Sequence, residues 1–290
     1  MNRIWILARM TFREALRRKI VLTGLLLGIG FLVLFSVGFH YIIVQVSQVS
    51  SAANSGDPTG QAASNITSTE SKHAILLAGL YAVTFLSVAM AALLGADTLA
   101  GEIGSGIIQT IVTKPIRRSD VILGKWLGFA GLLGMYFGLV AGGVVLSVWL
   151  QSGYAPNHLA LGLALIYLES LLIMTISLAG SSAFSALATG GMVFGLYGLA
   201  FIGGWIEQIG SILQNSTAVK VGVIASLIIP SEALWRRAAF EMQTPMGAMM
   251  GGMSPFGATS VPSPLMIAYA CLYLLAVLAL AVRSFAGRDL

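Results

Sequence analysis

A stripe of polar side chains lies in the connection between the second and third apolar stretches of the sequence. Over residues 101–113 a helical pattern places isoleucine and valine on one face, while the other face carries Glu102, Gly106, Gln109 and Thr113. Pro115 then ends the helix, because proline lacks the backbone donor that a helix requires. The pattern predicts a short amphipathic helix within segment 97–120, with its apolar face toward lipid or helix ends and its polar face toward a partner.

Glu169 is an acidic residue in the middle of an otherwise uncharged apolar stretch. An ionisable group in such a place is costly unless it faces a protein interior, a water-filled path or a hydrogen-bond partner. Two interpretations stay open, a role in a path or subunit interface and a buried structural carboxyl group. In either case we expect the side chain to be shielded from lipid.

Methionines crowd into a short segment near the last apolar stretch, at Met246, Met249, Met250 and Met253. Thioethers are soft ligands that suit Cu(I). They also fill irregular surfaces, because the methionine side chain is flexible and polarisable. A soft-metal site and an adaptable apolar loop therefore both fit this cluster.

A phosphate-binding loop requires Gly-x4-Gly-Lys followed by Ser or Thr. The nearest match, Gly124-Lys125, is followed by Trp126 and lacks the first glycine. No catalytic constellation of Ser, His and Asp and no paired-carboxylate site stands out. The sequence predicts neither ATP hydrolysis by this chain, nor an enzyme active site, nor a cofactor site.

The composition indicates an integral membrane protein. Of the 290 residues, 57% are hydrophobic and 9% are charged, against about 25% charged in soluble domains. The net charge of +5 does not indicate nucleic-acid binding, because the basic residues stand beside apolar stretches, where they suit anionic lipid headgroups. The single cysteine, Cys271, excludes a disulfide within the chain.

Six apolar stretches approach or exceed the roughly 20 helical residues needed to cross a membrane. They are Ile20–Val46, Ala74–Ala96, Val121–Leu150, Leu159–Gly180, Ala183–Ile206 and Pro264–Val282. Several contain Gly-x3-Gly ridges that allow close helix packing, at Gly24 and Gly28, at Gly134, Gly138 and Gly142, and at Gly191 and Gly195.

Lys and Arg gather in the N-terminal segment, in the connection after the second stretch and in the C-terminal tail. The positive-inside rule therefore places both termini in the cytoplasm. Residues 1–19 alternate arginines with an apolar arc, which predicts an interfacial helix. We interpret Ser47–Lys72 as a flexible external loop and 207–263 as an external cap of short helices, in which Thr217–Ile229 is re-entrant or interfacial.

The segment from Ala100 to Lys125 carries Ala-Gly-Glu, Ser-Gly, Pro, Arg and Gly-Lys in that order. With the basic N-terminal helix and six spans, it resembles the membrane subunit of type-2 ABC transporters, in the group linked to multi-copper enzyme maturation. The resemblance implies that Glu102 and Gly106 belong to a coupling helix that docks on the ATPase, and that Arg118 follows it. The sequence Ile229–Trp235 is similar to the outer hairpin before the last span of that family.

The resemblance implies an all-helical permease, one transmembrane domain over 1–290, in a prokaryotic cytoplasmic membrane. Its partners would be two cytoplasmic ABC ATPase subunits, a second permease copy or close relative, and membrane lipids. Closure of the ATPases would push on the coupling helix and drive alternating access. Two alternatives remain, an ion-coupled secondary carrier or channel that uses Glu169, and a membrane scaffold that transports nothing.

Overall fold

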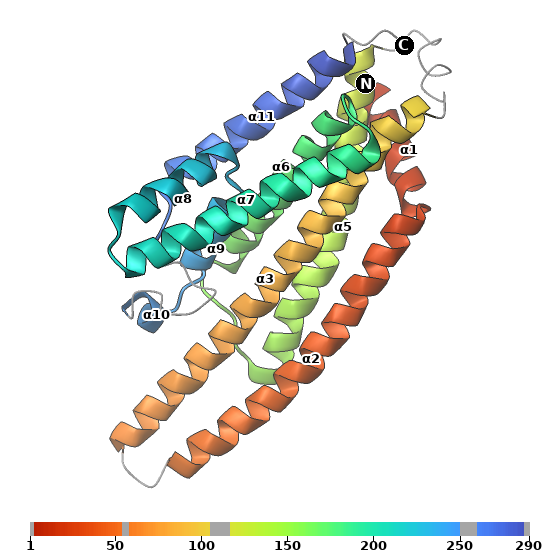
Figure 1. Cartoon of the computed structure of the whole chain (residues 1–290). Helices are drawn as coiled ribbons and strands as arrows, with labels where there is room; N and C mark the ends of the chain where they lie inside the picture. The colour runs from red at the N-terminus through yellow and green to blue at the C-terminus, as the bar shows by residue number, and fades with distance from the viewer. Residues whose placement is uncertain (1–2, 54–57, 105–116, 250–259, 287–290) are drawn as a thin grey trace.

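The computed structural model describes residues 3–53, 58–104, 117–249 and 260–286, and within these ranges the chain forms helices and no strand (Figure 1). This confirms the predicted all-helical class. The helices are α1 (Arg3–Leu16), α2 (Lys19–Ala53), α3 (Pro58–Gly104), α5 (Arg118–Ser152), α6 (Leu159–Ser181), α7 (Ala186–Ile212), α8 (Ser216–Ile228), α9 (Ser231–Glu241), α10 (Pro245–Met249) and α11 (Leu265–Ala286).

Six of these helices, α2, α3, α5, α6, α7 and α11, are long and apolar enough to cross a membrane. They correspond to the six apolar stretches of the sequence, which confirms a multi-pass membrane protein. Each of them contains a long apolar run with at most two charged side chains. Such segments must be helical in lipid, because every backbone polar group then finds its partner within the segment.

The prediction of a flexible loop over Ser47–Lys72 is wrong. Helix α2 continues to Ala53 and α3 begins at Pro58, so most of this segment is helical. Proline suits the first position of a helix, where its missing N–H would have no helical partner. Helix α3 therefore runs over 47 residues, or about 70 Å at 1.5 Å per residue, and links the two ends of the molecule.

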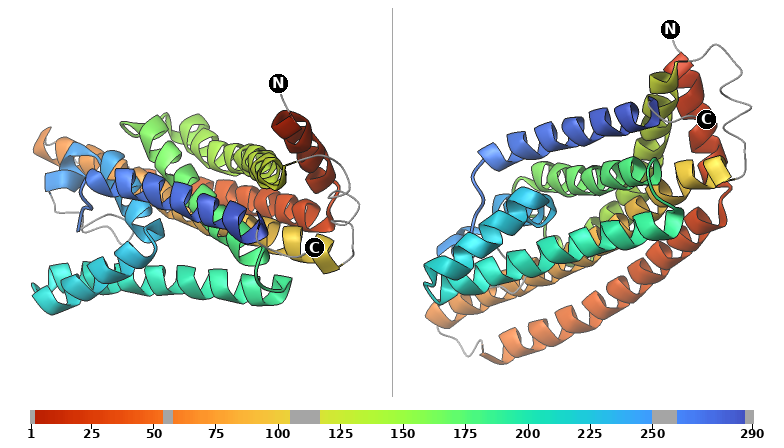
Figure 2. Two further views of the ribbon diagram at one scale, coloured as in Figure 1. Left: turned by 90° about the horizontal axis from the view of Figure 1, so that it is seen from above. Right: turned by 45° about the horizontal axis from the view of Figure 1, so that its top comes forward.

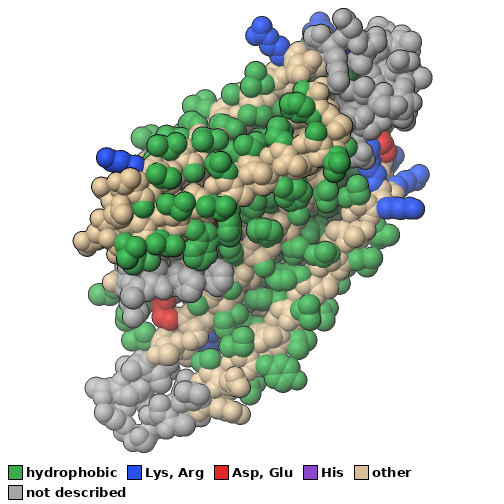
Figure 3. Space-filling model, in the orientation of Figure 1, with side chains coloured by type: hydrophobic (Ala, Val, Ile, Leu, Met, Phe, Trp, Pro, Cys, Tyr) green, Lys and Arg blue, Asp and Glu red, His purple; other side chains and the backbone are tan. Residues whose placement is uncertain are grey.

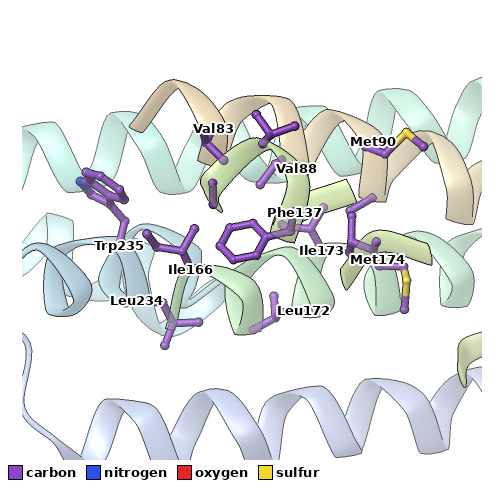
Figure 4. Packing of buried hydrophobic residues seen from close by; sticks show 14 of the residues in the cluster. Val83, Val88, Met90, Phe137, Ile166, Leu172, Ile173, Met174, Leu234 and Trp235 are labelled. Atoms are coloured by element: carbon purple, nitrogen blue, oxygen red, sulfur yellow. The ribbon is translucent and has the colours of Figure 1, made fainter. Parts of the chain in front are cut away.

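The core of the bundle lies among α3, α5 and α6. In the most apolar parts of α3 and α6, 56% of the residues are buried, and in that of α5 44% are, whereas in that of α2 only 11% are buried. Figure 4 shows Phe137 of α5 pointing between Ile166 and Ile173 of α6 and Val88 of α3. The outer helices leave large hydrophobic side chains exposed, and these cover the middle of the face shown in Figure 3.

Helices α7 and α8 form an antiparallel helical hairpin. A Cβ atom built at Gly210 or Gly203 of α7 would lie 2.7 or 2.3 Å from the Cβ atom of Ala218 or Ala225 of α8. Glycine at these two positions lets the two backbones approach closely. Since later residues of α8 face earlier residues of α7, α8 runs back along α7 into the bundle (Figure 1).

Helices α8 and α9 are bent relative to each other by 107°. Met242, just after α9, lies against Gly162 near the start of α6, so α9 returns to the end from which α8 entered. The pair thus enters the bundle and returns to the same end, and we call it the re-entrant hairpin after this geometry. Of the segment 207–263, residues 207–212 continue α7, and the other described residues include α8, α9 and α10.

Both termini lie at one end of the bundle (Figures 1 and 2). We call this the basic end, because most of the Lys and Arg side chains visible in Figure 3 gather there. Helix α1 lies beside the start of α5 at this end. The opposite end holds the α5–α6 connection and α10.

Candidate functional site

The described flanks of the expected coupling segment 97–120 lie at the basic end, in the last turns of α3 and at the start of α5 (Figure 1). Glu102 is in the last turn of α3, which continues to Gly104, and Arg118 is the first residue of α5. The other three residues of the predicted polar stripe, Gly106, Gln109 and Thr113, lie outside the described residues. The structure therefore places the two flanks of this segment and the helices to which they are attached.

Arg118 joins the start of α5 to the end of α11. Its Nη1 atom donates to the backbone carbonyl oxygens of Ala286 and Phe285, at 3.1 and 3.5 Å. The last carbonyls of a helix have no partner within the helix, and a cation is stabilised at that terminus. Sequence analysis could not find this contact, because the acceptors are backbone atoms far along the chain.

Two glycines bring α1 and α5 into backbone contact. A Cβ atom at Gly128 would lie 2.7 Å from the carbonyl oxygen of Ala8 and 3.2 Å from the backbone nitrogen of Phe12. A Cβ atom at Gly124 would lie 2.6 Å from the Cβ atom of Leu7. The spacing of four residues puts both glycines on one face of α5. The expected amphipathic helix α1 is thereby docked onto the helix that begins directly after the coupling segment.

Glu169 lies at the centre of the bundle, on α6. Its side chain is fully buried, as expected, and neither carboxyl oxygen has a hydrogen-bond partner in the structure. Glu232 of α9, which is also buried, lies close enough to interact with it electrostatically. Buried carboxyl oxygens in native proteins nearly always have partners, so the two unpartnered oxygens of Glu169 make this residue a candidate for function.

A second buried charged group connects the re-entrant hairpin to α7. Arg236 of α9 lies 2.7 Å from Oε1 of Glu207 on α7 and donates from Nη2 to Oε2 at 2.8 Å. The same Nη2 donates to Ser226 of α8 at 3.1 Å, and Ser260 donates to Oε1 of Glu207 at 2.7 Å. The sequence contains both charged residues, but it does not show that they form a pair.

Metal-binding side chains do not cluster in the part of the chain that the structure describes. No three His, Cys, Asp or Glu residues there are placed to hold a metal ion. Two of the four crowded methionines, Met246 and Met249, line a pocket near α10, and the other two lie outside the described residues.

The site thus combines the flanks of a helix connection at the basic end, helix α1 packed against α5, and a buried acid in the bundle centre. A comparison with protein families matches residues 5–290 to the ABC-2 family transporter protein. The chain belongs to the ABC-2 transporter family. It is therefore a membrane permease subunit of an ABC transporter rather than an enzyme, and membership implies an ABC ATPase partner. A comparison with curated proteins gives no match.

Proposed function

We propose that this ABC-2 permease is driven by two copies of a separate ABC ATPase that dock on segment 97–120, with Glu102, Gly106, Gln109, Thr113 and Arg118 as coupling residues. The observation that carries the proposal is the joining of three helices at the flanks of this segment. Arg118 connects α5 to α11, and the glycine face of α5 connects it to α1. A push on the segment would therefore move α1, α5 and α11 together, along with α3, whose last turn contains Glu102.

The permease would lie in a prokaryotic cytoplasmic membrane with both termini in the cytoplasm. The gathering of basic side chains at one end supports this orientation (Figure 3). Pairing with a second copy or a close relative would cover part of the exposed apolar surface of α2, with lipids covering the rest. The segment 207–263 would close the external end of the path, and the likeness to permeases of multi-copper enzyme maturation gives the narrower subgroup that we propose.

Glu102→Arg should weaken copurification of the cognate ATPase at least about tenfold, because charge reversal in a complementary interface costs several kcal/mol. Membrane insertion should not change, since Glu102 lies at the end of α3 beyond the apolar span. The measurement is the amount of ATPase retained by the tagged permease, together with the ATP turnover of the reconstituted complex.

The matched control is Lys220→Glu, a charge reversal at an exposed position of α8 and far from the basic end. It should leave ATPase retention unchanged. Equal retention and equal coupled turnover in Glu102→Arg and the unmodified protein would refute the assignment of Glu102 to the ATPase contact.

An ion-coupled carrier or channel is the second candidate function, and the unpartnered carboxyl group of Glu169 is the observation that favours it. Such a protein would move protons or ions without an ATPase. In the ATP-driven permease, Glu169 would instead belong to the transport path. The two functions therefore differ in whether the chain moves protons or ions in the absence of an ATPase.

Glu169→Gln separates these functions, because glutamine has nearly the shape of the neutral carboxyl group and should preserve assembly. We expect liposomes that contain the permease alone to show the same proton flux as protein-free liposomes under an imposed potential, before and after the substitution. A pH-sensitive dye inside the vesicles measures this flux. A flux carried by the unmodified permease and abolished by Glu169→Gln would instead establish the ion-coupled function.

A further inference from the structure

A pocket of about 450 Å³ lies at the end of the molecule opposite the basic end. Its walls come from three separate parts of the chain, the outer turns of α3, the α5–α6 connection, and the connection from α9 into α10. The volume falls in the range typical of small-molecule sites. The pocket exists because α3 is already helical before the predicted apolar stretch that begins at Ala74, so that Asn65, Thr69 and Glu70 form one wall.

Glu70 is the one residue with a formal charge among the described residues that line this pocket. Its Oε1 atom accepts a hydrogen bond from the hydroxyl group of Thr244. The Thr244 oxygen in turn accepts from the backbone N–H of Gly247 at 2.9 Å. This chain of bonds fixes the carboxylate before any ligand arrives, which lowers the entropy cost of binding.

The second carboxylate oxygen of Glu70 has no hydrogen bond to any residue that the structure describes. A Cβ atom at Gly247 would lie 3.5 Å from this Oε2 atom, so a larger side chain at Gly247 would come into contact with it. The lone hydroxyl hydrogen of Thr244 is already donated to Glu70, which leaves Thr244 with acceptor capacity only. The wall therefore offers acceptors and one negative charge, and it suits a ligand with charged N–H donors.

The rest of the lining is apolar or neutral. Met246 and Met249 supply flexible thioether side chains that adapt to aromatic and aliphatic groups. The Tyr154 hydroxyl group lies 3.0 Å from Nδ1 of buried His73, which holds the phenol ring in place. Burial and the nearby Glu70 charge raise the pKa of Tyr154 to about 12, so Tyr154 stays neutral and adds no second charge.

We propose that this pocket binds a small organic cation, with the ammonium or amidinium group on Glu70 and the apolar part against Met246, Met249 and Tyr154. A single fixed carboxylate beside adaptable apolar side chains matches the two halves of such a molecule. Charge-assisted hydrogen bonds to the free oxygen would supply the affinity that a neutral ligand lacks. The inference does not depend on the proposed coupling to an ATPase, because binding is measured on this chain alone.

The test is titration calorimetry on the full chain in nanodiscs of zwitterionic lipid, with benzamidine as the probe and benzamide as its neutral counterpart. Benzamidine should bind, and benzamide should bind at least about tenfold more weakly, since a hydrogen bond to a charged group contributes more than a neutral one. Glu70→Gln should reduce benzamidine affinity to the level of benzamide. The Thr244 hydroxyl group can still donate to the glutamine carbonyl oxygen, so the pocket should stay folded.

Glu14→Gln is the matched control, because Glu14 is an exposed carboxylate at the basic end and should leave benzamidine affinity unchanged. A melting curve for each variant verifies that it is folded. Failure of the unmodified protein to bind benzamidine at millimolar concentration would overturn the proposal, as would equal affinities for the two probes or an unchanged affinity in Glu70→Gln.

Titration with Ag(I) tests the other chemistry of this lining. One combined result would show that the pocket holds a soft metal and not an organic cation. In it, the unmodified protein binds Ag(I) saturably and fails to bind benzamidine, and Met246→Leu and Met249→Leu abolish the Ag(I) binding. If the pocket binds an organic cation, these two substitutions should weaken benzamidine binding only modestly, because leucine keeps the apolar contact.

Discussion

Arg236→Met should lower the free energy of unfolding by about 3 to 5 kcal/mol, the loss expected when one partner of a buried ion pair is removed. The side chains of Arg236 and Glu207 are only 1% and 5% exposed. Methionine fills part of the arginine volume but leaves the Glu207 carboxylate buried, and among the described residues only Ser260 then donates to it. Denaturant unfolding in detergent, followed by tryptophan fluorescence, measures the loss.

The double variant Glu207→Gln with Arg236→Met should recover a large part of this stability. It removes both charges, so no uncompensated ion stays in the apolar interior. A cycle with the two single variants isolates the energy of the pair, because the side chains are in direct contact. Additive losses in the double variant would contradict the prediction and would mean that the pair contributes nothing.

Arg283→Met is the control for the loss of an arginine. Arg283 is exposed near the end of α11, and its replacement should change stability by less than about 0.5 kcal/mol. Arg236 joins α9 to α7 and α8, so its loss should loosen the re-entrant hairpin before it unfolds the bundle.

The six spans could be predicted because a long apolar run that crosses a membrane must fold as a helix to satisfy its backbone polar groups. Each predicted stretch overlaps the helix that forms, and the disagreements fall at the ends. The failure over Ser47–Lys72 has a physical reason. Its small polar residues are typical of loops, yet alanine, glutamine and lysine are good helix formers, and a helix that already runs through the span extends without a new nucleation cost.

Close glycine contacts were only partly predictable. Gly24 and Gly28 face Met90 and Val140, as a packing ridge requires, whereas no atom lies within 4 Å of a Cβ built at Gly138 or Gly142. Spacing shows which residues share a helix face, but not which face meets another helix. The pair that matters most at the basic end, Gly124 and Gly128, was not among the predicted ridges.

The candidate site was likewise only partly predictable from the sequence. Burial of Glu169 followed from the cost of a charge in an apolar span, and the structure agrees. The contact of Arg118 with α11 and the pairing of Arg236 with Glu207 depend on the tertiary arrangement of helices. A single sequence carries no direct signal for such long-range pairs.

Gly128→Leu should undock α1 from α5 and reduce the coupling of ATP turnover to the permease. A Cβ atom at this position would already lie 2.7 Å from a carbonyl oxygen and 2.9 Å from the Cβ atom of Thr11, and the leucine side chain adds three more carbons. Backbone atoms of α1 cannot rotate away, so the helices must separate. Overpacking of this kind costs about 1 to 3 kcal/mol, which corresponds to a change of about 5- to 150-fold in the undocked population.

Trypsin measures that population, because α1 carries Arg9 and Arg13 and a detached helix of 14 residues is only marginally stable in water. Cleavage in α1 should accelerate by the same factor when opening and closing are faster than cleavage. Gly138→Leu makes the same change on the same helix at a position with open space around the Cβ atom, and it should leave both cleavage and coupled turnover unchanged. If Gly128→Leu matched this control in both measurements, α1 would be an anchor alone, and the transfer of force through it to α5 would have to be abandoned.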